Sequence, residues 1–350
     1  MNESAARTSL ELTRPDDWHL HLRDGDALHA VVGASAAQFG RAIVMPNLRP
    51  PVVTVAQALA YRQRIAAALP EGARFTPLMT LYLTDRTSAD EIRRASDREC
   101  VHAVKLYPAG ATTNSEAGVT DLRRTWPALD AMQVSGIPLL VHGEVTDPEV
   151  DVFDREAAFI DRVLIPLRRD FPALRVVFEH VTTREAVQYV EHADGDVGAT
   201  ITPQHLLYDR NAIFAGGLRP HRYCLPVLKR YVHRRALVDA ATGGNPRFFL
   251  GTDSAPHAAR LKEHACGCAG CYTAPHAIES YAAVFEAAGA LDRLEAFASF
   301  HGADFYRLPR NVERIELRRV PWIVPETLPF GADSIVPLAA GETLEWKLAR

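Results

Sequence analysis

Short apolar runs alternate along this chain with longer stretches whose apolar residues recur at helical spacing. Short runs rich in β-branched and aliphatic side chains indicate buried strands, and apolar positions three and four residues apart indicate the helices that cover them. The expected strands are Trp18–Leu22, Ala42–Met45, Phe75–Tyr82, Ala103–Leu106, Pro138–Val141, Arg175–Phe178, Gly198–Ile201 and Phe248–Leu250. The chain is therefore expected to alternate strand and helix over most of its length.

Helices are expected between these strands, and Thr54, Ser88 and Asp121 stand where N-caps belong. The expected helices are Asp26–Phe39, Val55–Ala68, Ser88–Ser96, Leu122–Ser135, Arg155–Arg169, Arg184–Glu191 and Lys229–Thr242, with more near Ile278–Ala288 and Leu291–Tyr306. Eight β–α units predict an α/β protein with one (β/α)8 TIM barrel domain over residues 1–350, in which about 311–350 form a C-terminal extension. The alternative is a doubly wound open sheet, but its Gly-rich phosphate fingerprint is absent after the first strand.

Composition is that of a globular protein and excludes several other classes. Hydrophobic residues make up 47% and charged residues 23% of the chain, so it is not disordered, collagen-like or a small disulfide scaffold. A net charge of −4 gives no electrostatic footprint for nucleic acid or an anionic membrane. No apolar run approaches the roughly 20 residues of a membrane span, and the first residues lack the apolar core of a secretory signal. A cytoplasmic location with reduced cysteines is therefore expected.

Three of the five cysteines stand together in C-G-C-A-G-C, residues 266–271. Cys266, Cys268 and Cys271 could bind zinc, but a structural zinc site needs four ligands, usually in two pairs on separate loops. His264 or His276 could add the fourth ligand only at irregular spacing. The alternative is a tight Gly-rich loop that lets the backbone approach a ligand closely.

The 14 histidines are the one unusual count, and several fall where a barrel carries its catalytic groups. Those groups lie at the C-terminal ends of the strands and in the loops that follow. His19 and His21 are two residues apart on the first expected strand, so they share one face of it. At the other strand ends stand His142, His180, Asp253 and His257, and Lys105 lies in the otherwise apolar fourth strand.

Each of these residues also has an ordinary explanation when it is taken alone. His142 and His180 could be hydrogen-bonded core histidines, Lys105 could reach solvent, and Asp253 could cap a helix. The convergence of four histidines, one aspartate and one lysine on one rim favours a common site instead.

Four histidines and one aspartate exceed the ligands of a single catalytic metal with an open position, so they suit two divalent metals such as zinc. An unmodified lysine is a poor bridge because its ammonium has no lone pair. Burial near cations lowers the pKa of a lysine, and the neutral amine can add CO2 to form a carbamate with one oxygen for each metal. Paired metals share a hydroxide that is nucleophilic at neutral pH, so hydrolysis at a carbonyl is the expected reaction. Asp253 could move the proton to the leaving nitrogen.

The longer motifs around these residues resemble the amidohydrolase superfamily and, within it, the dihydroorotases of the short, stand-alone bacterial type. They span about residues 14 to 272, the helical segment to about 306 also fits, and together they are highly specific. The motifs are R-P-D-D-W-H-L-H-L-R-D-G, A-I-V-M-P-N-L, K-L-Y-P-A-G-A-T-T-N-S, L-L-V-H-G-E-V, V-F-E-H-V-T-T, A-T-I-T-P-Q-H-L, R-P-H-R-Y-C-L-P-V-L-K-R, F-L-G-T-D-S-A-P-H and C-G-C-A-G-C.

The resemblance implies a homodimeric enzyme of pyrimidine biosynthesis that interconverts N-carbamoyl-L-aspartate and L-dihydroorotate. It implies one Zn2+ on His19, His21 and Asp253 and a second Zn2+ on His142 and His180. Carboxylated Lys105 and a hydroxide would bridge the two Zn2+ ions of each subunit, and Asp253 would shuttle the proton.

The resemblance also implies the substrate contacts. The substrate carboxylate would lie against Arg23, Asn47 and His257, and the ring against the backbone of Leu225 and Ala269. Segment 109–115 would close over the substrate, with contacts from Thr112 and Thr113. One departure from the expected pattern is Gly110, where an Asn is expected.

Three alternatives remain at this point. A hydantoinase-like hydrolase of cyclic amides would use nearly the same chemistry, but its substrate does not need a carboxylate clamp of Arg23, Asn47 and His257. A catalytically silent barrel that serves another pyrimidine enzyme predicts lost metal ligands, and all six are present. A zinc-binding module on the cysteine loop predicts metal that is lost when the loop is mutated.

Overall fold

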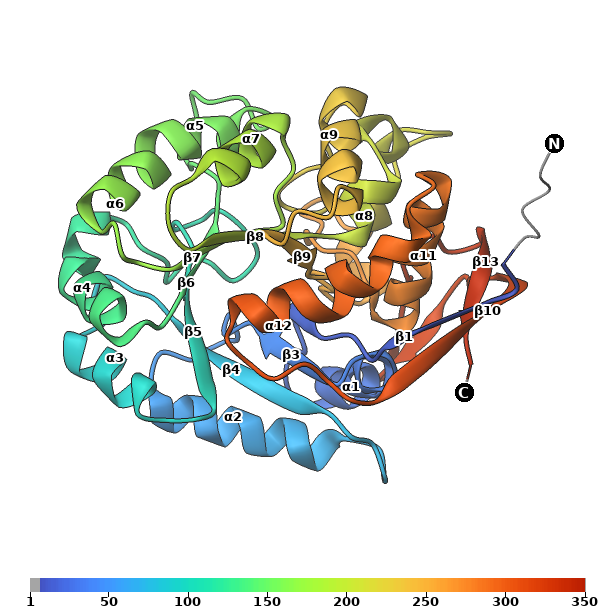
Figure 1. Cartoon of the computed structure of the whole chain (residues 1–350), viewed down its shortest axis with the longest axis horizontal. Coiled ribbons are helices and arrows are strands. Elements are labelled where there is room, and N and C mark those ends of the chain that lie inside the picture. The colour runs from blue at the N-terminus through green and yellow to red at the C-terminus, as the bar shows by residue number, and fades with distance from the viewer. Residues whose placement is uncertain (1–6, 350) are drawn as a thin grey trace.

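The computed structural model describes residues 7–349 and places eight parallel strands in a nearly closed barrel (Figure 1). The strands follow one another around the barrel in chain order, and a parallel bridge from Leu20 to Ser254 joins the last strand to the first. They are β2 (Asp17–Leu20), β3 (Arg41–Val44), β4 (Thr76–Tyr82), β5 (Val101–Leu106), β6 (Leu139–His142), β7 (Val176–Glu179), β8 (Val197–Ile201) and β9 (Phe248–Leu250). The predicted barrel and its eight strands are confirmed, and the open sheet is excluded.

Helices surround the barrel at the predicted places, and the three predicted N-caps are present. Thr54 forms a capping box with Gln57, Ser88 accepts a hydrogen bond from the Glu91 amide, and Asp121 accepts one from the Arg123 amide. The helices are α1 (Asp26–Gln38), α2 (Val55–Ala68), α3 (Ala89–Ser96), η1 (Leu122–Thr125), α4 (Trp126–Ser135), α5 (Arg155–Phe159), η2 (Ile160–Leu164), α6 (Ile165–Asp170), α7 (Arg184–His192), α9 (Tyr231–Thr242), α11 (Ala277–Ala287), η6 (Leu291–Arg293), η7 (Ala296–Phe300) and α12 (His301–Phe305).

Several short helices were not predicted. They lie in the loops around the C-terminal ends of β8 and β9, where turns of three to five residues leave no periodic pattern to detect. These are α8 (Pro203–Leu207), η3 (Arg210–Ile213), η4 (Pro220–Arg222), α10 (Ala259–Lys262) and η5 (Ala274–His276).

A small antiparallel sheet lies beside the barrel and joins the two ends of the chain (Figure 1). Its strands are β1 (Ser9–Thr13), β10 (Arg314–Ile323) and β13 (Thr343–Leu348), with β10 in the middle. Trp346 on β13 is fully buried and its indole N–H donates to Glu286 of α11, 3.1 Å away. A hairpin of β11 (Leu328–Phe330) and β12 (Asp333–Ile335) lies between β10 and β13 in the sequence. The predicted C-terminal extension thus contains a ten-residue strand, β10.

Apolar side chains fill one layer of the barrel interior and leave its other end to polar groups. Seven strands each contribute a buried apolar residue to this layer, and the eighth contributes Gly198, beside the ring of Phe249. Ala303 and Tyr306 at the end of α12 pack against the same layer, where Tyr306 stacks on Trp18 with ring centroids 4.6 Å apart. The seven strand residues are Trp18, Ile43, Leu78, Ala103, Leu140, Val177 and Phe249. This packing makes the C-terminal ends of the strands the place for a site.

Within residues 7–349 no helix is long and apolar enough to cross a membrane.

Candidate active site

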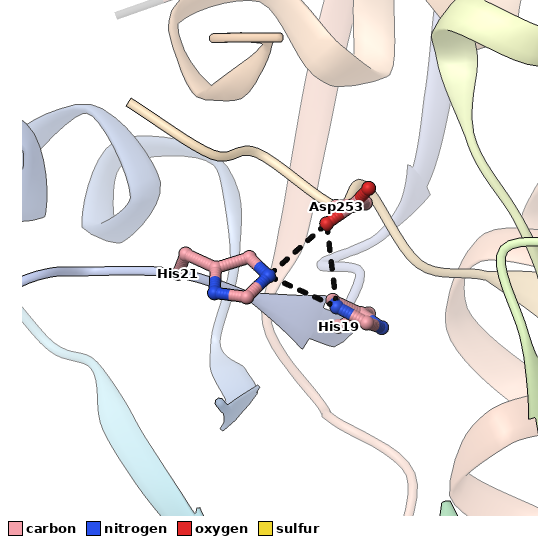
Figure 2. A group of neighbouring side chains, drawn as sticks. All are labelled: His19, His21 and Asp253. Atoms are coloured by element: carbon pink, nitrogen blue, oxygen red, sulfur yellow. Dashed lines mark hydrogen bonds and ion pairs between the residues drawn. The ribbon is translucent and has the colours of Figure 1, made fainter. Parts of the chain in front are cut away.

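Three of the predicted metal ligands meet at the C-terminal ends of β2 and β9 (Figure 2). The Nε2 atoms of His19 and His21 are 3.2 Å apart. Oδ1 of Asp253 lies 3.3 Å from His19 Nε2 and 3.1 Å from His21 Nε2. All three side chains are buried, so these atoms share a small volume away from bulk water.

The protonation states of this group suit a cation. Burial lowers the pKa of His21 to about 4, although Asp253 opposes the shift. Burial alone would raise the pKa of Asp253, but His19 and His21 lower it to about 2. At neutral pH, His21 is therefore an uncharged imidazole beside an ionised carboxylate. Nitrogen and carboxylate lone pairs that converge on one point are what a divalent metal requires, so these residues fit a metal ion.

Backbone strain is concentrated in the same region. Among the described residues, six other than glycine have positive φ, and three of these are Arg23 at 60°, His180 at 43° and Asp253 at 46°. Such conformations persist only where neighbouring groups hold them, and they cluster at functional sites. The amide of Asp253 donates to the carbonyl of His19, 2.9 Å away, and the preceding residue, Thr252, donates from both its amide and its hydroxyl to the carboxylate of Asp17.

His142 and His180 form the second part of the cluster. Their ring centroids are 4.8 Å apart, and the ring of His180 lies 5.0 Å from that of His19. Burial and the nearby charge of Lys105 lower the pKa of His180 well below its usual value, and its Nδ1 has no hydrogen-bond partner among the described residues. Nε2 of His142 contacts Oε2 of Glu144 at 2.9 Å, so within residues 7–349 Nδ1 is the ring nitrogen of His142 without a hydrogen bond. Both rings can therefore supply a nitrogen to a metal.

Lys105 lies inside the barrel on β5 and is fully buried. Its ammonium forms an ion pair with Glu179, which is also fully buried, and lies 4.8 Å from the centre of the Tyr107 ring. Burial lowers the pKa of Lys105, while Glu179 acts in the opposite direction. The lysine does not reach solvent, so the ordinary explanation for a strand-end lysine does not apply.

The residues expected to contact the substrate surround the metal-ligand cluster. One narrow cavity is lined by His19, His21, Arg23, Asn47, Tyr107, Thr112, Thr113, His142, His180, Leu225, Asp253, Ala255, Ala269 and Gly270. Two predicted site residues are not part of this lining: Lys105 is buried, and His257 contacts a guanidinium nitrogen of Arg23 through Nε2 at 2.9 Å. The structure thus brings all the predicted residues into one region.

Segment 109–115 lies over this cavity through hydrogen bonds to its walls. The side-chain amide of Asn47 donates to the carbonyl of Thr113 at 3.1 Å, and the hydroxyl of Thr113 donates to the carbonyl of Ala269 at 3.4 Å. Gly110 has φ of 79°, a left-handed conformation that glycine and asparagine both adopt. The backbone of this segment can therefore adopt the same conformation with Gly110 as with the expected asparagine.

The cysteine loop holds none of the clusters that could bind a metal. Within residues 7–349, groups of three or more ligand atoms form only among His19, His21, Glu179, His180 and Asp253. Cys266 is exposed and Cys271 is buried, so the three thiols do not share one environment. The buried ammonium of Lys262 instead donates to the carbonyls of Tyr223, Cys268 and Gly270, which shapes the loop beside Ala269.

Sequence reasoning missed the groups that orient the ligands. Glu144 and Glu179 each contact a ligand histidine, and Asn47 Oδ1 lies 2.8 Å from Nδ1 of His21. The motifs H-G-E and F-E-H contained a signal, because a carboxylate often accepts the second ring N–H of a metal-binding histidine.

Comparison with known proteins finds similarity both in sequence and in fold. The amidohydrolase family matches residues 17–333. A dihydroorotase of Cupriavidus necator is 70% identical over 338 residues, which cover 97% of this chain and 98% of that protein. The crystal structure of a dihydroorotase from Campylobacter jejuni has a TM-score of 0.91 at 34% identity and covers 100% of both chains. An L-hydantoinase of Arthrobacter aurescens has a TM-score of 0.81 at 16% identity, covers 97% of this chain and 83% of that one, and shares the fold alone.

Proposed function

This chain belongs to the amidohydrolase family, and from that premise we propose that it is a dihydroorotase. It would hydrolyse the cyclic amide of L-dihydroorotate to N-carbamoyl-L-aspartate and catalyse the reverse cyclisation in pyrimidine biosynthesis. The observation that carries the proposal is a cationic carboxylate clamp beside a buried cluster of metal ligands. The high identity to dihydroorotases over almost the whole chain supports the same reaction.

The donor set fits two divalent metals, which we take to be zinc. His19, His21 and Asp253 would hold one ion and His142 with His180 the other. Lys105, carboxylated on Nζ, would hold both. A metal pair supplies Lewis-acid polarisation of a carbonyl and a water that is nucleophilic at neutral pH. The lowered pKa of buried Lys105 supports carboxylation, because only the neutral amine reacts with CO2.

Asp253 is the proposed proton carrier. Its pKa of about 2 keeps it ionised at neutral pH, and its carboxylate lies at the metal-ligand cluster. It can accept the proton of the attacking water and deliver it to the nitrogen that leaves the ring. The strained backbone at Asp253 fixes the direction of this carboxylate.

Arg23, Asn47 and His257 are the proposed carboxylate clamp. Arg23 and His257 contact each other, and burial together with the charge of Arg23 lowers the pKa of His257 to about 2. His257 is therefore a neutral imidazole whose Nε2 accepts a hydrogen bond from the guanidinium of Arg23 and so orients the guanidinium fork. The backbone of Leu225 and Ala269 would contact the ring, and Thr112 and Thr113 would contact the substrate from segment 109–115.

The clamp is also the feature that distinguishes this site from that of a hydantoinase-like enzyme. A hydantoin has no carboxylate to pair with Arg23, so a half-buried guanidinium would find no partner in the substrate. The hydantoinases among the solved structures are also the more distant relatives, at 16% identity or less.

The expected state of the enzyme is a homodimer in the cytoplasm.

Kinetics of Arg23→Lys test this proposal. Wild-type protein loaded with zinc should hydrolyse L-dihydroorotate and strongly prefer it to dihydrouracil, which has the same ring without the carboxylate. Lysine cannot form the bidentate pair, so the KM for L-dihydroorotate should rise roughly 10- to 100-fold with a smaller change in kcat. Hydrolysis of dihydrouracil should be little affected. Equal rates of the wild type on both substrates would contradict the proposed function.

A further inference from the structure

Glu179 lies at the end of β7, one residue before the ligand His180, and its side chain is fully buried. Its two carboxylate oxygens face two different predicted ligands. Oε1 lies 3.1 Å from Nδ1 of His19, and Oε2 forms the ion pair with Nζ of Lys105. A buried carboxylate costs free energy unless donors surround it. Among the described residues, Nζ of Lys105 donates to Oε2, while Oε1 and Nδ1 of His19 lie at ion-pair distance and have no other partner.

The contact with His19 determines which ring nitrogen faces the metal position. Nε2 of His19 points to Asp253 and His21, and Nδ1 points to Glu179. A neutral imidazole carries one proton, and a neighbouring carboxylate holds that proton on the nearer nitrogen. The proton therefore belongs on Nδ1, and the lone pair of Nε2 is left to a metal.

The contact with Lys105 determines where its nitrogen lies. Nζ bears hydrogen both as an ammonium and after one N–H bond has been replaced by the N–C bond of a carbamate. Oε2 can accept a hydrogen bond from Nζ in either state, so Glu179 can stay in place through the change. The carbamate oxygens then have to point away from Glu179, because like charges repel.

We propose that Glu179 is a positioning residue of the metal centre, which holds His19 in its Nδ1–H tautomer and anchors Nζ of Lys105 with the same carboxylate. This inference rests on the proposed function, since the carbamate belongs to that function. A purely structural ion pair would explain only the contact with Lys105, and not a second oxygen directed at a metal ligand. Glu144 repeats the arrangement on one ligand only, because it contacts Nε2 of His142 and leaves Nδ1 free.

Glu179→Gln tests the proposal with nearly unchanged volume. An amide has one acceptor and one donor end, so it cannot accept from both Nδ1 of His19 and Nζ of Lys105. We expect zinc affinity, measured by competition with a chelator, to fall roughly 10- to 100-fold. Incorporation of 13C-labelled CO2, measured by NMR, should also fall.

Two other variants serve as controls. Glu144→Gln should lower zinc affinity while the carbamate signal is retained, because Glu144 does not contact Lys105. Glu295→Gln removes a carboxylate that binds Thr13 and Arg314 away from the cavity, and it should change neither measurement. Wild-type zinc affinity and a full carbamate signal in Glu179→Gln would overturn the proposal.

A measurement on the wild type decides the question if Glu179→Gln does not fold. Nitrogen-15 NMR of the histidine rings in zinc-loaded protein should show a proton on Nδ1 of His19. An Nδ1 without a proton, or metal bound through Nδ1, would overturn the role of Glu179. A wild type without a carbamate signal would contradict the proposed bridge at Lys105, whereas the His19 tautomer would still decide the role of Glu179. Neither readout depends on turnover.

Discussion

Arg23 combines a strained backbone with a functional side chain. Its φ of 60° costs an L-residue about 1–2 kcal/mol, so neighbouring groups must hold it. The hydroxyl of Tyr61, on α2, donates to the carbonyl of Arg23 at 2.5 Å. The guanidinium in turn donates to the carbonyl of Pro256 at 3.1 Å and contacts His257. Tyr61 therefore supports the proposed carboxylate clamp from outside the lining of the cavity.

Removal of this hydroxyl by Tyr61→Phe should weaken substrate binding more than catalysis. The lost hydrogen bond is worth about 1 kcal/mol, which corresponds to a rise of roughly fivefold in the KM for L-dihydroorotate at nearly constant kcat. Tyr281→Phe is the matched control, because Tyr281 is equally buried and donates to the carbonyl of Ile201 at 2.7 Å. The control should lose similar stability without a change in KM. Equal KM values for the two variants would show that Tyr61 does not position Arg23.

At the scale of single residues, the sequence identified the groups that can bind metal but not those that orient them. His19, His21, His142, His180 and Asp253 could be chosen because strand ends meet at one rim of a barrel. Glu144 and Glu179 stand beside ligand histidines in the sequence, yet the ring nitrogen that each contacts depends on side-chain geometry. Tyr61 and Asp17 act through contacts with residues far along the chain, which no local pattern reveals.

At the scale of elements, the sequence predicted the barrel strands, which are buried on both faces. It missed β10, most of which is exposed. The barrel strands are continuous apolar runs, as parallel strands between a core and helices are expected to be. β10 instead carries arginines and has one buried position, Leu317, so no apolar run marks it as a strand. The helix predicted over Arg155–Arg169 contains the π-helical turn η2. Pro166 follows this turn without an N–H to donate, so the regular hydrogen-bond ladder is interrupted there.

The contact of α12 with β2 gives a prediction at this scale. A Cβ on Gly302 would lie 2.0 Å from Nε1 of Trp18, inside the packed layer of the barrel. Gly302→Ala should therefore lower the free energy of unfolding by about 1–3 kcal/mol, measured by urea denaturation. In Gly33→Ala, on α1, the new Cβ would meet only the ring of Pro70 at 3.2 Å, and stability should change by less than about 1 kcal/mol. Equal effects of the two substitutions would show that α12 does not hold Trp18 tightly.

At the scale of the whole molecule, the side chains that stabilise the barrel and the side chains of the proposed site lie in different layers of its interior. Apolar side chains and α12 fill one layer of its interior, and the titratable groups gather at the C-terminal ends of the strands. Strand count and order followed from the sequence because each β–α unit is local. The sheet of β1, β10 and β13 depends on contacts between distant residues, so the sequence alone did not predict it. The proposed local clamp would let this near-neutral chain recognise an anion without a basic surface.

The rate of L-dihydroorotate hydrolysis as a function of zinc bound per chain tests the proposed metal chemistry most directly. Metal-free protein should be inactive, and the rate should reach its maximum at two zinc ions per chain in the presence of bicarbonate. Lys105→Ala, measured in parallel, should stay roughly a hundredfold or more below the wild type at any zinc level, because it cannot form the bridge. Full activity in metal-free protein, or in Lys105→Ala, would contradict a two-metal centre bridged by Lys105.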